Sequence, residues 1–362
     1  MRKTFLICAL AITAGCAKKQ TPAPSVSSAI ITTFAGNGSF GYSGDGGAAT
    51  AAKLNGPINV ATDNSGNVFI VDAGNYFIRK VNNTGIISTI AGTTSYTPGS
   101  GNGDGGAATN AIMIPITIAV DNSGNVYIVD GNYVSIRKVN TSGIITTIAG
   151  DGIQSDTTNN IPATAATFNN PYGVAADNSG NVYVSDIADF CIRKINSAGI
   201  INTIAGNGTG GYTGDGGPAT AAEIVAYDLA ADNNGNLYFS DGSSVVRKIS
   251  ASGIITTIAG NGQKGYSADG NAATASQLTE PYGIAVDNSG NVYISEKGNQ
   301  RVRMVNTSGI LHTIAGGGTG GLGDGHAATA AELLSPRGVA FDNSGNVFIA
   351  DLGNNRVRKV SK

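Results

Sequence analysis

The side chains best suited to acid–base and metal chemistry are scarce in this chain of 362 residues, which has two histidines and three cysteines. His312 and His326 are too few for a zinc site built from three histidines. Cys191 lies in a strand-like segment with no histidine near it in the sequence, so we expect a packed thiol rather than a nucleophile. The sequence therefore predicts no catalytic residue, no metal site and no cofactor, and it favours binding over catalysis.

Aspartates followed by glycine form a second set of residues that are candidates for metal or acid–base chemistry. G-D-G surrounds Asp45, Asp104, Asp215 and Asp324, and A-D-G contains Asp269. Calcium requires several oxygen ligands, whereas each of these loops offers one carboxylate. The A-A-T-A-A type of segment that follows resembles a single helical turn, which an Asp or Gly near its start could cap. We therefore expect turn and capping roles for these acids and no metal binding.

A third set pairs an acid with an arginine six or seven residues later. The acids are Asp72, Asp130, Asp186, Asp241, Glu296 and Asp351, and the arginines are Arg79, Arg137, Arg193, Arg247, Arg303 and Arg358. Carboxylates that catalyse as a pair must converge on one site. Six equivalent pairs instead indicate structure, with each pair either bridging a hairpin or packing against the next unit.

The second and third sets recur because the chain is a sixfold repeat. D-N-S-G-N begins at Asp63, Asp121, Asp177, Asp287 and Asp342, with D-N-N-G-N at Asp232, so the spacing is 55 to 58 residues. Each unit contains four short strand patterns; in the third unit they are 173–177, 181–186, 192–195 and 200–205. Six such units predict an all-β protein, a six-bladed β-propeller of four-stranded antiparallel blades.

The repeated motifs also carry a family resemblance. P-Y-G-V-A-A-D-N-S-G-N-V-Y-V-S-D at 171–186 and the I-A-G-N-G segments closely resemble the NHL-repeat β-propellers, especially those of exported bacterial lipoproteins. The resemblance covers residues 29–362. The last unit ends on its third strand at 356–360, and an orphan fourth strand stands at 30–35. We therefore expect the N-terminal strand to pair into the C-terminal blade and close the ring, which hides sheet edges.

The N-terminal residues have the pattern of an export signal. Arg2 and Lys3 precede an apolar run at 5–13 that is too short to span a membrane, and Ala14-Gly15 precede Cys16. Residues 1–16 resemble a lipoprotein signal peptide with Cys16 as the lipidated residue; an ordinary signal peptide cleaved at another small residue is the alternative. Residues 17–28 are polar and form the expected tether. We expect a bacterial cell-envelope protein on the periplasmic or cell-surface side, held to the membrane only by lipid.

Binding residues are expected where the repeat is broken. The connections from the fourth strand of one unit to the first strand of the next run about 20 residues. They share a face, the long-loop face, with the loops between the second and third strands, and long loops on a rigid scaffold often bind ligands. The residues that enter the first strands vary between units. They supply the candidate binding set Asn59, Thr117, Tyr172, Tyr227, Asp228, Tyr282 and Arg337.

Tyrosines beside polar groups suit a sugar or a peptide. The alternative is that these tyrosines merely plug the mouth of the central channel. The net charge of −2 and the pI of about 5.7 provide no basic surface, so nucleic acid is not an expected partner. The sequence thus predicts a monomeric, non-catalytic binding scaffold for a glycan or a protein. A propeller enzyme of the lactonase or lyase kind is the second hypothesis.

Overall fold

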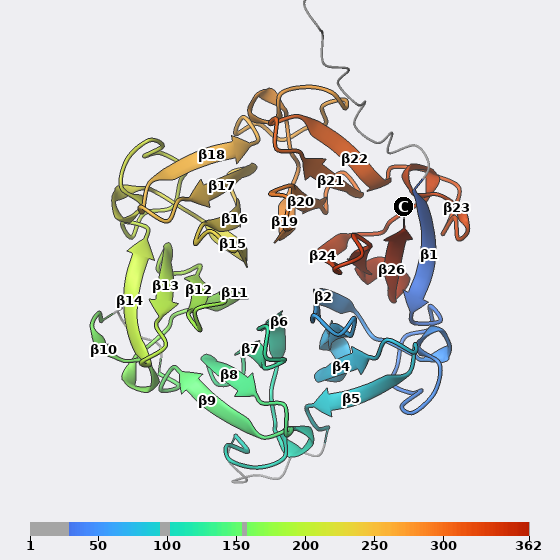
Figure 1. Cartoon of the computed structure of the whole chain (residues 1–362), viewed down its shortest axis with the longest axis horizontal. Helices are drawn as coiled ribbons and strands as arrows, with labels where there is room; N and C mark the ends of the chain where they lie inside the picture. Colours follow the sequence, from blue (N-terminus) through green and yellow to red (C-terminus); the bar gives the residue numbers. More distant parts are fainter. Residues whose placement is uncertain (1–28, 95–101, 154–157, 362) are drawn as a thin grey trace, which may run out of the picture.

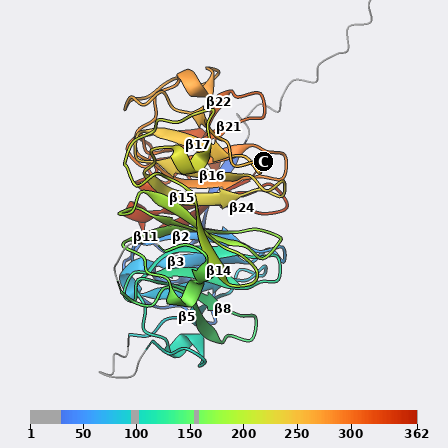
Figure 2. The same ribbon diagram turned by 90° about the vertical axis from the view of Figure 1, so that its left-hand side faces the viewer.

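A computed structural model describes residues 29–94, 102–153 and 158–361. They form six blades around a central axis (Figure 1), and the molecule is a disc that is thinner along this axis than across it (Figure 2). The predicted signal peptide, tether and lipidated Cys16 lie outside the described residues. Within the described ranges, no helix has the length and apolar character needed to cross a membrane.

Each blade is an antiparallel sheet with its first strand nearest the axis. The strands from inside to outside are β2 (Pro57–Thr62), β3 (Val68–Asp72), β4 (Phe77–Val81) and β5 (Ile87–Ala91) in blade one; β6 (Pro115–Val120), β7 (Val126–Asp130), β8 (Ser135–Val139) and β9 (Ile145–Ala149) in blade two; and β11 (Pro171–Ala176), β12 (Val182–Asp186), β13 (Cys191–Ile195) and β14 (Ile200–Ala205) in blade three. Blade four contains β15 (Ala226–Ala231), β16 (Leu237–Asp241), β17 (Val245–Ile249) and β18 (Ile255–Ala259); blade five contains β19 (Pro281–Val286), β20 (Val292–Glu296), β21 (Arg301–Val305) and β22 (Leu311–Gly316); and blade six contains β24 (Pro336–Phe341), β25 (Val347–Asp351), β26 (Arg356–Ser361) and β1 (Ile30–Ala35). The predicted six-bladed architecture is confirmed.

Blade six is closed by strands from both ends of the chain. The N-terminal strand β1 lies antiparallel beside β26, with Ile31 opposite Val360 and Thr33 opposite Arg358 (Figure 1). Ile31 is fully buried between blades, whereas its neighbour Ile30 is exposed. The predicted closure is therefore confirmed, and it adds a buried apolar side chain as well as the strand pairing.

The core lies between blades rather than within one sheet. All five residues of each second strand are buried, as the pattern of apolar residues on both faces predicted. In the cluster between blades one and two, Phe69 and Val71 of β3 pack with Ile118 and Ile128 of the next blade. Since every blade contributes to two such clusters, the rigidity of the ring depends on all six blades together.

The long connections cover the outer edge of each blade. In blade one, Gly46 donates its N–H to the carbonyl of Ile87, and Ile87 donates to Gly47. In blades three and six the pairing extends to the short fifth strands β10 (Ile161–Pro162) and β23 (His326–Ala327). These connections hide the outermost strand, whose exposed edge could otherwise pair with another chain. Much of their length is therefore structural.

The expected capping role of the G-D-G aspartates is wrong. The segments after them do form single turns of 3-10 helix, such as η2 (Ala49–Ala51), but its capping residue Ala48 makes no side-chain bond. Asp45 instead accepts hydrogen bonds from the Arg79 guanidinium at 2.5 Å and from the Thr89 N–H at 3.1 Å. The carboxylate therefore ties the connection to two strands of the blade. It bonds to the guanidinium rather than to the N–H groups of the helical turn, because a hydrogen bond between two charged groups is stronger.

The six arginines of the third set are fully buried. In blade one, Arg79 also contacts Asp72 across the β3–β4 hairpin at 3.4 Å. The same hairpin contact joins Arg137 to Asp130, Arg303 to Glu296 and Arg358 to Asp351. The predicted structural role across the hairpin is confirmed in these four blades. A buried guanidinium is tolerated here because acids approach it from both the hairpin and the connection.

Candidate functional site

Three of the predicted binding residues form an aromatic cluster at one end of the axis. The side chains of Tyr172, Tyr227 and Tyr282, each the second residue of an innermost strand, meet with ring centroids 5.5 to 5.9 Å apart. The Arg337 guanidinium lies 4.6 Å from the Tyr282 ring centroid. These four residues, which we term the tyrosine cluster, come from four successive blades and break the sixfold symmetry.

Hydroxyl groups hold the backbone of this cluster from the preceding blade. Ser185 of β12 donates to the carbonyl of Tyr227 at 2.7 Å, and Ser240 of β16 donates to Tyr282 at 2.5 Å. Ser295 and Thr117 donate in the same way to the carbonyls of Arg337 and Tyr172. The cluster is therefore positioned by bonds between rigid strands rather than by loops.

Sequence reasoning missed these serines, although a signal is present. Ser185, Ser240 and Ser295 occupy the fourth position of the second strand in blades three, four and five. The equivalent residues in the other blades are Val71, Val129 and Ala350. Hydroxyls thus occur in the three blades that precede Tyr227, Tyr282 and Arg337. Gly173 also allows the close approach of blade four, because a Cβ at this position would overlap the Tyr227 carbonyl oxygen.

The other three predicted binding residues are buried between blades. Thr117 uses its hydroxyl for Tyr172, and Asn59 accepts the Ile118 N–H at 3.3 Å. Asp228 accepts the N–H groups of Leu229 and Ile284 at 3.0 and 3.2 Å. Burial raises the pKa of Asp228 to about 7, although these two backbone bonds oppose the shift. These three residues therefore connect blades, and the tyrosine cluster is the accessible part of the predicted set.

The tyrosine cluster closes its end of the axis. The cavity beneath it, lined in part by Tyr172, Tyr282 and Arg337, has a volume of only about 10 Å³. A ligand at this end would therefore lie on the cluster rather than inside it. Plugging the channel and presenting an aromatic surface are compatible roles for the same rings.

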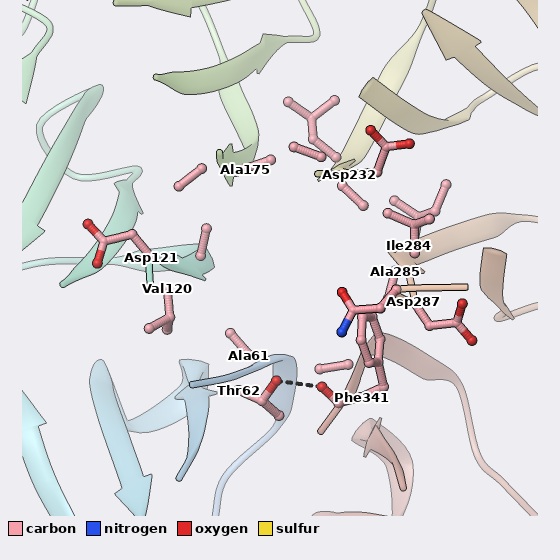
Figure 3. A pocket seen from close by; sticks show the side chains of 18 of the residues that line it. Ala61, Thr62, Val120, Asp121, Ala175, Asp232, Ile284, Ala285, Asp287 and Phe341 are labelled. Carbon is pink, nitrogen blue, oxygen red and sulfur yellow. Dashed lines mark hydrogen bonds between the residues drawn. The ribbon is translucent and has the colours of Figure 1, made fainter. Parts of the chain in front are cut away.

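A larger cavity opens at the opposite end, beside the D-N-S-G-N turns (Figure 3). This central channel has a volume of about 440 Å³ and is walled by the innermost strands, including Ala61, Ala175 and Ala285. In the sequence, the D-N-S-G-N turns served only to identify the repeat, and none of their residues was among the predicted binding residues. Residues that repeat in all blades can nevertheless surround one shared cavity on the axis.

The nucleophile and imidazole candidates lie far from both ends of the axis. Cys191 is buried in β13, and burial raises the pKa of its thiol to about 12. His312 belongs to β22 and His326 to β23, which are outer strands of blades five and six. In the part of the chain that the structure describes, no three of the His, Cys, Asp and Glu side chains form a potential metal site.

Comparisons with known proteins place the chain in a family. The model of the teneurin NHL domain matches residues 37–102, 97–164 and 262–320, and that of the NHL repeat matches 333–360. Chicken teneurin-1 is 28% identical over 92% of this chain, but the chain spans only 14% of teneurin-1.

Two solved structures share the fold. An auxiliary nutrient binding protein from Bacteroides ovatus superposes with a TM-score of 0.67 at 15% identity, covering 92% of this chain and 76% of that one. A gluconolactonase from Xanthomonas campestris gives 0.57 at 12% identity, covering 92% and 90%. At such identities the likeness concerns the fold alone. The repeats, the closed six-bladed ring and the family models agree, and this chain belongs to the NHL-repeat β-propellers.

Proposed function

We propose that this protein is a non-catalytic binding scaffold whose tyrosine cluster takes a glycan or a protein ligand on the long-loop face. The observation that carries the proposal is the convergence of Tyr172, Tyr227, Tyr282 and Arg337 where the repeat loses its symmetry. Aromatic rings bury much apolar area at low entropy cost and keep a hydroxyl for hydrogen bonding. Arg337 adds donors for a carbonyl or hydroxyl of the ligand.

Structural neighbours support ligand binding without deciding between binding and catalysis. One neighbour is named as a nutrient binding protein, whereas another is named as a gluconolactonase. The same fold thus hosts both kinds of function, and the choice depends on the site. The buried thiol of Cys191 and the outer positions of both histidines favour binding. Hydrolysis of a lactone by the purified protein would support the enzyme hypothesis instead.

The proposal is tested on the cluster itself. A glycan array and a pull-down of envelope proteins identify the ligand, and calorimetry then compares Tyr227→Ala and Tyr282→Ala with the parent chain. Each substitution should weaken binding by about 1–3 kcal/mol, the range of interface hot spots. Tyr212→Ala is the matched control, because Tyr212 is an exposed tyrosine on a peripheral connection. A ligand whose affinity is unchanged by both cluster substitutions would refute the assignment.

The proposed location is the bacterial cell envelope, through lipid on Cys16. Cys16→Ser should move the protein from the membrane fraction to the soluble fraction, because the segment at 17–28 is polar. A variant that stays with membranes after a salt wash would show that another anchor holds it. This test concerns location alone and leaves the ligand proposal unaffected.

A further inference from the structure

Six asparagine side chains surround the mouth of the central channel, and five hydrogen bonds link them into a ring with one gap. They are the second residues of the repeated turns: Asn64, Asn122, Asn178, Asn233, Asn288 and Asn343. Asn64 donates to Asn122 at 3.0 Å, and Asn122 and Asn178 each donate to the next asparagine. Asn233 donates to Asn288 at 3.2 Å, and Asn343 donates back to Asn64 at 3.4 Å. All five of these bonds run in one direction around the axis.

The turns do not need these asparagines for their own stability. In blade one, Asp63 accepts the N–H groups of Ser65 and Asn67 with one carboxylate oxygen, and the Asn67 amide with the other. Asn64 takes no part in those bonds. Its recurrence in all six units therefore requires a different explanation, and the ring of carboxamides supplies one.

The ring retains unused hydrogen-bonding capacity. A carboxamide carries two N–H donors and an oxygen with two lone pairs. Each of the five head-to-tail bonds uses one donor of one asparagine and one lone pair of the next, and in the described structure no such bond joins Asn288 and Asn343. Because the six side chains are exposed at the channel mouth, the remaining donors and lone pairs can bond to a molecule inside it.

The ionisable side chains among the described residues that line the channel are five aspartates: Asp63, Asp121, Asp228, Asp232 and Asp287. Among the described residues that line it, none is Lys or Arg. The carboxylates of Asp121, Asp232 and Asp287 point away from its centre, towards their own turns (Figure 3). Asp121, for example, is bonded by Asn125 and by the Tyr127 hydroxyl.

We propose that the central channel is a second binding site, which takes a small, uncharged, hydroxyl-rich molecule of the mono- or disaccharide class. Hydroxyl groups donate and accept, as the free positions of the carboxamide ring require. An anionic ligand would lose water here without gaining an opposite charge, which is costly, and a cation inside the channel would find the rim carboxylates of Asp121, Asp232 and Asp287 turned away from it. The volume of about 440 Å³ falls in the usual range for small-molecule sites.

This site is independent of the tyrosine cluster, since the two lie at opposite ends of the innermost strands. Asp228 and Asn59 line both cavities and separate them. Among the described residues, Asp228 is the acidic side chain that lines both cavities, and both of its oxygens accept backbone N–H groups. Substitutions at one site should therefore leave the other site unaffected.

The test is calorimetry on the full-length chain with glucose and maltose, each titrated to about 10 mM, where weak binding is still measurable. Glucosamine and glucuronate serve as charged analogues of the same size. We expect at least one of the neutral sugars to bind with one-to-one stoichiometry and glucuronate not to bind. Binding of glucosamine without either neutral sugar would overturn the proposal in favour of a cation site. No binding of either neutral sugar would overturn it as well.

Two variants locate the sugar. The double substitution Asn122→Ala and Asn178→Ala removes two neighbouring members of the ring and should raise the Kd roughly tenfold. Asn83→Ala is the matched control, because Asn83 is exposed near the same turns and bonds to the Ser65 carbonyl rather than to the ring. An equal loss in the control, or no loss in the double variant, would overturn the assignment.

A third variant narrows the channel with a residue that the fold already accommodates. Blade six carries Phe341 at the end of its innermost strand, and Ala176 occupies the equivalent position in blade three. Ala176→Phe should reduce sugar binding at least tenfold while Tyr227→Ala leaves it unchanged. Loss of sugar binding in Tyr227→Ala alone would place the sugar at the other end of the axis and overturn the proposal.

Discussion

At the scale of single residues, one position shows how a neutral and an acidic side chain can make the same contact. Asn59 in blade one and Asp228 in blade four each accept a backbone N–H from the following blade, those of Ile118 and Ile284. The amide does so without charge, whereas the carboxylate must lose its hydration on burial. Asp228 therefore introduces a pH dependence that Asn59 does not.

Replacing Asp228 with asparagine should stabilise the protein at neutral and alkaline pH. Burial raises the pKa of Asp228 from 3.8 to about 7, so the native state holds a proton that the unfolded state has released. The stability contributed by that proton is complete below about pH 4 and is lost as the pH rises through 7. At pH 8, Asp228→Asn should gain at most about 4 kcal/mol, and near pH 4 almost nothing. Thermal melts across this range measure the difference.

The reciprocal variant Asn59→Asp is the control for that experiment. It places a carboxylate in the equivalent contact of blade one and should create the loss of stability above neutral pH that Asp228→Asn removes. Equal melting curves for Asp228→Asn and the parent chain at pH 4 and pH 8 would show that Asp228 is not protonated by burial.

At the scale of the strands and connections, the loop acid clamps the outer edge of a blade. Asp45→Ala removes the acceptor of the Thr89 N–H and one partner of Arg79. A hydrogen bond to a charged group contributes about 1.5–3 kcal/mol, so exchange of the Thr89 amide should accelerate by roughly ten- to a hundredfold. Hydrogen exchange read by NMR measures it. The Thr257 amide of blade four, which donates to Asp215, should not change, and an unchanged Thr89 amide would contradict the clamp.

The repeat could be predicted from the sequence because its information is local. Strand alternation, turn residues and a period of 55 to 58 residues fixed the six blades, and the phase of the last unit predicted the closure. The roles of Asp45 and Asn64 could not be predicted in this way. Asp45 meets Arg79 only after the connection folds back over β5, and Asn64 meets Asn122 only when blade two packs beside blade one. Contacts of this kind depend on the placement of whole blades.

At the scale of the whole molecule, removal of the closing strand should cost more than its own contacts. Deletion of residues 29–36 removes β1 with the buried Ile31 and leaves β26 as an unpaired edge. We expect the truncated chain to self-associate and its melting temperature to fall by at least about 10 °C. Each kcal/mol of lost stability lowers the melting temperature of a chain of this size by about 2–4 °C. Light scattering and thermal melts test this, and deletion of residues 17–28 is the control. A monomeric truncated chain with an unchanged melting temperature would refute the structural role of closure.

The pairing of β1 with β26 also determines when the molecule can finish folding. Ile30 and its partner Ser361 lie about 330 residues apart in the sequence. At about 5–20 residues per second, a ribosome makes the first strand roughly 15 to 65 s before its partner exists. During that time the segment Ile-Ile-Thr-Thr-Phe-Ala has no native partner in its own chain. A second copy made nearby could accept it, so strand exchange between newly made chains is the misfolding route to which this architecture is most exposed.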